Sequence, residues 1–125
     1  MATVLVVEDE FGIVELFDAV LTDEGYQVLT AMNGRDGLEL LAKERPDLVF
    51  CDFMMPVMDG EAMLGAMTAN PALRGIPVVM MSSMPEAVVA ERCSGYVTFM
   101  RKPFKLFALL DVVERVLGKS DGRAS

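Results

Sequence analysis

The sequence predicts an α/β fold, a doubly wound sheet of five parallel strands with helices on both faces. Five short apolar runs alternate with segments of helical periodicity along the 125 residues. Two of these runs, residues 4–7 and 48–52, lack the polar alternation of half-exposed strands, which is typical of strands buried on both faces. The second run ends in a carboxylate, Asp52, and ligands bind beyond the carboxyl ends of strands in such sheets.

The first half of the chain predicts three strands and two helices. The strand at residues 4–7 is followed by three acids and then by apolar residues at the spacing of a half-buried helix: Ile13, Leu16, Phe17, Val20 and Leu21. Gly25 is expected to stop this helix. The more polar run 26–31 predicts a strand at the sheet edge. Asn33 can cap the second helix, which must end before Pro46.

The second half predicts two more strands, at residues 78–81 and 96–100, and three helices. Asp59 is a suitable N-cap for the third helix. Ser83 and Glu86 predict a capping box at the start of a short fourth helix. The last helix carries apolar residues at helical spacing: Leu106, Leu109, Leu110, Val113 and Leu117.

The alternation predicts a single domain over residues 1–119, followed by a polar tail over residues 120–125. No internal linker, repeat or low-complexity segment interrupts it. The expected strand order is 2-1-3-4-5, the order of flavodoxin-like folds. The strands at 4–7 and 48–52 are then central neighbours, and the loops that follow them meet in one crevice.

The composition excludes several classes of function. The formal net charge is −8 without any His, which disfavours direct binding to nucleic acid or to an anionic membrane. No apolar run reaches the roughly 18 residues of a membrane span, and the N-terminus lacks the basic region of a signal peptide. We therefore expect a cytoplasmic protein. Cys51 and Cys93 have no metal-binding spacing, so we expect two reduced thiols without a disulfide or zinc.

Each predicted strand, except the one at the edge, delivers polar side chains to the same end of the sheet. These residues are Glu8, Asp9, Asp52, Ser82 and Lys102. Carboxylates that converge within about 4 Å repel one another, so a cation must be present. Lys102 supplies one positive charge, and Mg²⁺ suits a shallow site held by two or three carboxylates. An Asp beside Mg²⁺ and Lys is a competent nucleophile toward a phosphoryl group, which Ser82 can hydrogen-bond.

These motifs resemble the receiver domain of response regulators in two-component signalling, of the chemotaxis-regulator class. The resemblance covers essentially the whole chain. It rests on the acidic pair at 8–9, the D-x-M-M-P-x-M-D-G stretch at 52–60, Ser82, and the Lys-Pro-Phe at 102–104. The chain departs from the family pattern where Glu8 replaces the commoner Asp and Phe99 replaces the commoner Tyr.

The resemblance implies a role for each position. Asp52 would accept a phosphoryl group from a phosphohistidine on a histidine kinase or phosphotransfer protein. Mg²⁺ would be held by Glu8, Asp9, Asp52 and the backbone carbonyl of Met54. Lys102, preceding a cis peptide bond to Pro103, would contact the phosphoryl oxygens. Ser82 and Phe99 would move as switch residues and reshape the surface of the fourth helix, fifth strand and fifth helix, where an unknown downstream protein would bind.

The residues disfavour three other functions. A phosphatase with an Asp nucleophile requires a D-x-D motif, but Met54 stands at its second acidic position. A redox flavodoxin is disfavoured because three acids after the first strand would repel the FMN phosphate. A scaffold that no longer accepts phosphate is disfavoured because all five site positions are present. We expect no enzyme activity beyond self-phosphorylation and self-dephosphorylation.

Two aspects of assembly stay open at the level of sequence. The chain can be a stand-alone protein or one domain of a larger regulator or hybrid kinase, and we expect a monomer or weak dimer. An apolar patch formed by Val88, Val89, Tyr96 and Phe107 is as well explained by scattered surface residues as by an output face.

Overall fold

The computed structural model describes residues 1–118, so the predicted tail at 120–125 lies outside the described residues. The described chain forms one parallel five-stranded sheet in the order β2-β1-β3-β4-β5, as predicted. The strands are β1 (Thr3–Val7), β2 (Gln27–Ala31), β3 (Leu48–Asp52), β4 (Val78–Ser82) and β5 (Thr98–Arg101). The helices are α1 (Phe11–Asp23), α2 (Gly34–Lys43), α3 (Gly60–Ala69), α4 (Glu86–Arg92) and α5 (Leu106–Leu117).

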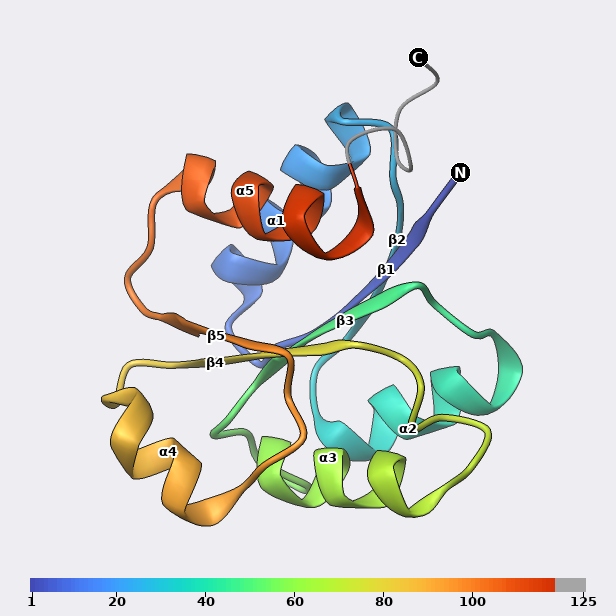
Figure 1. Ribbon diagram of the computed structural model, residues 1–125. Coiled ribbons are helices and arrows are strands. Elements are labelled where there is room, and N and C mark those ends of the chain that lie inside the picture. The colour runs from blue at the N-terminus through green and yellow to red at the C-terminus, as the bar shows by residue number, and fades with distance from the viewer. Residues whose placement is uncertain (119–125) are drawn as a thin grey trace.

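The helices cover both faces of the sheet. Figure 1 shows α1 and α5 on one face and α2, α3 and α4 on the other. The three central strands β1, β3 and β4 are buried along their whole length, whereas β2 at the edge is mostly exposed or half-buried. The sequence distinguished these two kinds of strand correctly, because a central strand of a doubly wound sheet meets a helix layer on each side.

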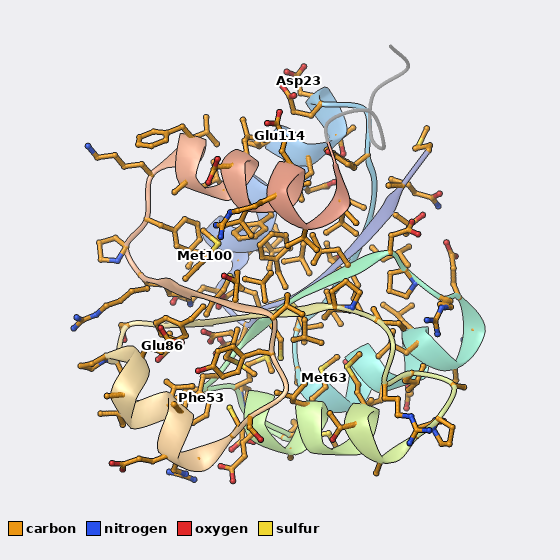
Figure 2. The ribbon with its side chains drawn as sticks, in the orientation of Figure 1. Asp23, Phe53, Met63, Glu86, Met100 and Glu114 are labelled. Carbon is orange, nitrogen blue, oxygen red and sulfur yellow. The ribbon has the colours of Figure 1, made fainter. Side chains whose placement is uncertain are left out.

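Side chains of each central strand alternate between the two core clusters. Val6 and Phe50 pack with Phe17 of α1 in one cluster, whereas Leu5 and Val49 pack in the other with residues of α3. In Figure 2, Met100 lies on the side of α5 and Met63 on the side of α3. Val6 pairs with Phe50 across the β1–β3 ladder. Two residues further on, this alternation and register place Glu8 and Asp52 side by side toward the same face.

Three of the helix-end residues predicted from the sequence are confirmed. The side chain of Asn33 accepts a hydrogen bond from the Asp36 N–H at the start of α2. Asp59 accepts one from the Ala62 N–H at the start of α3. Gly25, with φ 97°, follows α1 in the left-handed region where glycine costs least.

The start of α4 differs from the prediction. The expected capping box of Ser83 and Glu86 is wrong: α4 follows Pro85, and within residues 1–118 no side chain caps it. The hydroxyl of Ser82, one residue earlier, accepts a hydrogen bond from the Met84 N–H instead, so the turn closes before the helix begins. Strand β5 also begins two residues later than expected, at Thr98.

Three apolar residues lie elsewhere than predicted. Leu16 of α1 is 46% exposed, because it lies over the carboxyl end of the sheet, where it lines a surface cavity. Leu106 is 48% exposed in the first turn of α5. Val89 is fully buried, because it is the residue by which the short helix α4 joins the core, so it cannot contribute to a surface patch.

Within the described residues, both cysteines are free thiols, with Cys51 buried and Cys93 half-buried. No helix among residues 1–118 combines the length and apolar character that a membrane crossing requires.

The segment after β3 folds back onto the end of that strand. The N–H of Gly60 donates a hydrogen bond to the Phe53 carbonyl at 2.9 Å. A Cβ atom at position 60 would lie 2.4 Å from the Asp52 carbonyl oxygen and 2.9 Å from the Phe53 Cα. Any side chain there must therefore displace the backbone that carries Asp52.

Replacing this glycine tests that packing. We expect Gly60→Ala to lower the free energy of unfolding by about 2 kcal/mol, because the added methyl group overlaps rigid backbone. Gly65→Ala in the same helix is the matched control. Position 65 has open space around it. The control should raise stability by about 0.5–1 kcal/mol through helix propensity. Urea denaturation measures both, and equal effects of the two substitutions would refute the close approach.

Candidate functional site

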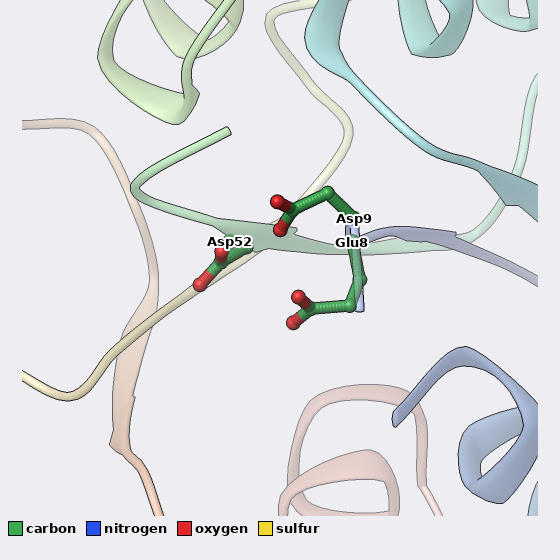
Figure 3. A group of neighbouring side chains, drawn as sticks. All are labelled: Glu8, Asp9 and Asp52. Carbon is green, nitrogen blue, oxygen red and sulfur yellow. The ribbon is translucent and has the colours of Figure 1, made fainter. Parts of the chain in front are cut away.

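Three carboxylates meet at the carboxyl end of the sheet. Glu8 and Asp9 directly follow β1, and Asp52 is the last residue of β3. In Figure 3 the side chains of Glu8 and Asp9 extend toward the side on which Asp52 lies. One carboxylate oxygen from each lies within 4.8 Å of the other two. The structure thus brings together the three acids that the sequence predicted as metal ligands.

Lys102 is the cation that contacts this group. Its Nζ lies 2.8 Å from Glu8 Oε1 and 3.0 Å from Asp52 Oδ1. The Lys102 side chain is 13% exposed, so these contacts are shielded from water. Its N–H donates to the Ser82 carbonyl, and its peptide bond to Pro103 is cis, as expected. The loop after β5 therefore holds the ammonium against both buried carboxylates.

Glu8 is completely buried, which is unusual for a charged side chain. Its Oε2 accepts a hydrogen bond from the Glu10 N–H at 3.2 Å. Its Oε1 is close to Lys102 but makes no hydrogen bond of good geometry within residues 1–118. The ion pair with Lys102 therefore leaves this oxygen incompletely satisfied, which a further positive charge at the site would correct.

The pKa values of Asp52, Glu8 and Lys102 are all shifted by burial and by their mutual contacts. It raises the pKa of Asp52 above its usual value, although Lys102 opposes this, and the charges of Asp9 and Glu10 add to the rise. Burial likewise raises the pKa of Glu8 against the effect of Lys102. For Lys102, burial lowers the pKa, but the contacts with Glu8 and Asp52 outweigh it and the net pKa is raised. The negative charge of the site thus exceeds what one lysine can balance.

An open cavity lies above Asp52. Asp9, Asp52, Met54, Ser82 and Lys102 line it, so it contains most of the predicted site residues. Ser82 is buried. Asp52 is therefore reachable by a small group that enters from solvent.

Two residues need comment beyond the predicted acidic centre: Phe99, which was predicted as a switch residue, and Glu10, which was not predicted as part of the site. Phe99 lies apart from this cavity, half-buried against the α3-side core and 6.4 Å from the Tyr96 ring, centroid to centroid. Glu10 was not predicted as a site residue, but its Oε1 lies 3.7 Å from Lys102 Nζ and it lines the cavity. The signal for Glu10 was present as the third acid after β1.

The donor set fits a hard divalent cation. Glu8, Asp9 and Asp52 provide oxygen ligands, with two of the three carboxylates buried and one oxygen of Glu8 incompletely satisfied. Such a set is typical of Mg²⁺, which prefers oxygen and keeps part of its water shell.

Comparison with known proteins agrees with the fold and the site. Residues 4–114 match the family model described as the response regulator receiver domain. The chain belongs to this family. The sequence resemblance is thereby confirmed, and the receiver domain is a signalling module of two-component response regulators.

Curated relatives include receiver proteins of similar and of much greater length. Sporulation initiation phosphotransferase F of Bacillus subtilis is 35% identical over 116 residues, which are 91% of this chain and 92% of the relative. The transcriptional regulatory protein GlrR of Escherichia coli is also 35% identical, over 95% of this chain, but this chain spans 27% of its length.

Solved structures show the same arrangement. The chemotaxis protein CheY4 of Vibrio cholerae superposes with a TM-score of 0.85 at 34% identity, covering 94% of this chain and 99% of that one. The receiver domain of the sensor histidine kinase PA1611 of Pseudomonas aeruginosa has a TM-score of 0.86 at 25% identity, over 94% of this receiver domain and 98% of that one. The latter structure contains a magnesium ion coordinated in its active-site cleft.

The raised pKa of Asp52 predicts how stability responds to its neutralisation. Because ionised Asp52 is disfavoured in the folded state, Asp52→Asn should raise the melting temperature in metal-free buffer at pH 7, by about 4 °C for a gain of about 1 kcal/mol. The gain should disappear as the pH falls below the ordinary pKa of Asp, where the wild-type carboxyl is protonated in both states.

Thermal melts between pH 3 and pH 8 in EDTA measure this effect. The control is Asp23→Asn, at the exposed C-terminal end of α1, which is not among the residues that line the cavity in the described chain. A lower melting temperature for Asp52→Asn at pH 7 would contradict the charge imbalance. Adding Mg²⁺ should raise the melting temperature of the wild type more than that of Asp52→Asn.

Proposed function

We propose that Asp52 accepts a phosphoryl group from a phosphohistidine on a histidine kinase or phosphotransfer protein, and that this modification switches a protein-binding surface. The observation that carries the proposal is the position of Asp52: its carboxylate contacts Lys102 at 3.0 Å and also lines the open cavity. We further propose that the receiver domain comprises residues 1–119, because α5 ends at Leu117, just before Gly118 with φ 92°.

Burial and contacts distinguish Asp52 from its two acidic neighbours. Glu8 is fully buried and is not among the residues that line the cavity in the described chain, so a donor cannot reach it. Asp9 lines the cavity, but among the ion pairs of residues 1–118 it has none with Lys102. Asp52 is the acid of the three that is both accessible and paired with the cation that would neutralise a transferred phosphoryl group.

The proposed reaction is a direct phosphoryl transfer. A carboxylate oxygen of Asp52 forms a bond to phosphorus while the P–N bond to the histidine imidazole breaks, and the nitrogen keeps the bonding electron pair. Lys102 would hold a phosphoryl oxygen and offset its charge. The Ser82 hydroxyl oxygen accepts the Met84 N–H at 3.0 Å, which leaves its O–H to donate to another phosphoryl oxygen.

We propose that Glu8, Asp9, Asp52 and the backbone carbonyl of Met54 hold a Mg²⁺ ion. When bound, the ion would supply positive charge where negative charge develops on the phosphoryl oxygens. The three carboxylates support this assignment by their proximity and the incomplete satisfaction of Glu8.

We place the downstream partner on the face formed by α4, β5 and α5. Several apolar side chains on these elements and the loop before β5 are exposed: Val88, Val97, Leu106 and Phe107. Phe99 connects this face with the interior, because it packs against the core on one side and borders a groove with Phe107 on the other. A change in Phe99 would therefore alter the surface that a partner contacts.

No substrate turnover is proposed beyond self-phosphorylation and self-dephosphorylation. A phosphatase that uses an Asp nucleophile needs a second acid two residues later, and Met54 occupies that position with a 64% exposed side chain. The name phosphotransferase belongs to the Bacillus relative and describes that protein.

Intact mass spectrometry tests the proposal. Wild-type protein incubated with Mg²⁺ and phosphoramidate should gain one phosphoryl group, and EDTA should prevent the gain. Asp52→Asn should remain unmodified, whereas the Asp23→Asn control should react like the wild type. Labelling of Asp52→Asn at the wild-type rate would assign the acceptor to another residue, and absence of labelling of the wild type would refute the function.

A further inference from the structure

We propose that Glu10 determines phosphodonor specificity by charge: it disfavours dianionic small-molecule donors at Asp52. This inference rests on the proposed function, because it concerns the rate at which Asp52 is phosphorylated. Glu10 is neither a predicted metal ligand nor the predicted acceptor.

The backbone explains why the Glu10 side chain faces the cavity. Glu10 occupies the N-cap position of α1, where a side chain commonly accepts a hydrogen bond from the helix N–H groups. Within the described residues its side chain makes no such capping bond. Its own N–H is held by Glu8 Oε2. Its carboxylate, 3.7 Å from Lys102, therefore lies at the rim of the cavity above Asp52.

The cavity is strongly acidic before any cation binds. Among its lining residues in the described chain, Asp9, Glu10 and Asp52 are negative and Lys102 is the positive one. Lys102 is shared with the buried Glu8 as well. A divalent cation would balance part of this charge, but Glu10 would remain an additional negative group on the path of an entering anion.

The expected effect of this charge is small but depends on the donor. Glu10 Oε1 and Asp52 Oδ1 lie 3.7 Å and 3.0 Å from the same Lys102 Nζ, so they are separated by less than about 7 Å. One unit charge about 7 Å from a dianion, in water and at physiological salt, should slow the reaction by roughly two- to threefold. A monoanion should be slowed by less than about twofold. A protein donor could offset the same repulsion through contacts with the apolar rim formed by Ile13, Leu16, Pro103 and Phe104.

Two small phosphodonors that differ in net charge distinguish electrostatic repulsion by Glu10 from a general change in the reactivity of Asp52. At pH 7 acetyl phosphate is a dianion and phosphoramidate is a monoanion. In each reaction an Asp52 oxygen bonds to phosphorus while the P–O bond to acetate, or the P–N bond to the ammonium nitrogen, breaks. The leaving group keeps the bonding electron pair, so no further reactant is needed.

The test compares labelling rates of the wild type, Glu10→Gln, Glu10→Asp and Glu15→Gln with both donors in Mg²⁺. Glu10→Gln should react roughly two- to threefold faster with acetyl phosphate and less than twofold faster with phosphoramidate, and the difference should shrink at high salt. Glu10→Asp, which keeps the charge, should retain the wild-type ratio of the two rates. Glu15→Gln is the control, because Glu15 is exposed on α1 and lies in a separate surface depression with Asp18 and Thr22.

Each outcome bears on a different claim. An unchanged ratio of the two rates in Glu10→Gln, or an equal change in Glu15→Gln, would refute the role of Glu10 while leaving phosphorylation of Asp52 intact. Failure of both donors to label the wild type would refute the proposed function and this inference with it.

Discussion

The contact of one lysine with two buried carboxylates is the interaction on which the carboxyl end of this sheet depends. Lys102 Nζ lies within 3.0 Å of both Glu8 and Asp52, and both acids are buried, Glu8 completely. Removal of a carboxylate from water costs several kcal/mol, and one ammonium shared between two carboxylates offsets this incompletely. The raised pKa values of Glu8 and Asp52 are the consequence. The folded chain therefore keeps an excess of negative charge at this site. Binding of a divalent cation there, or a reaction that adds charge to Asp52, should change the electrostatic energy of the site strongly.

The apolar scaffold holds this unfavourable arrangement in place. Alternation along β1 and β3 directs Val6 and Phe50 into the core and, two residues later, Glu8 and Asp52 toward the same face. The tight approach of Gly60 to the Asp52 carbonyl closes the loop after β3. On the other side, Arg92 of α4 stacks over the Phe53 ring and pairs with Glu61 of α3. These contacts join the residue after Asp52 to α3 and α4, so the acceptor is fixed to the elements that border the proposed partner surface.

The sequence predicted the fold and the acidic centre because both follow from short-range patterns. An uninterrupted apolar run predicts a central strand, and an Asp at its end predicts a site, since a carboxylate rarely closes such a run without a partner. The features that the sequence did not predict depend on long-range contacts or on competing local turns, which such patterns do not show. Glu10 escaped because an exposed acid at a helix start is usually explained by the helix dipole, and its contact with Lys102 joins residues 92 positions apart. The capping box predicted from Ser83 and Glu86 does not form, because the chain turns first: the Ser82 hydroxyl accepts the Met84 N–H where β4 ends, and α4 begins only after Pro85. Val89 could not be placed, because a seven-residue helix offers too few positions for its buried face to be identified from periodicity.

Calorimetric titration with Mg²⁺ tests the central claim, that Glu8 and Asp52 hold more negative charge than Lys102 balances. The wild type should bind one Mg²⁺ ion per chain, and Glu8→Gln and Asp52→Asn should each weaken the affinity by about tenfold or more, whereas Asp23→Asn should bind like the wild type. The Mg²⁺ affinity of the wild type should rise with pH as Glu8 and Asp52 lose their protons. Equal Mg²⁺ affinity in the wild type and both site variants would contradict this account of the site.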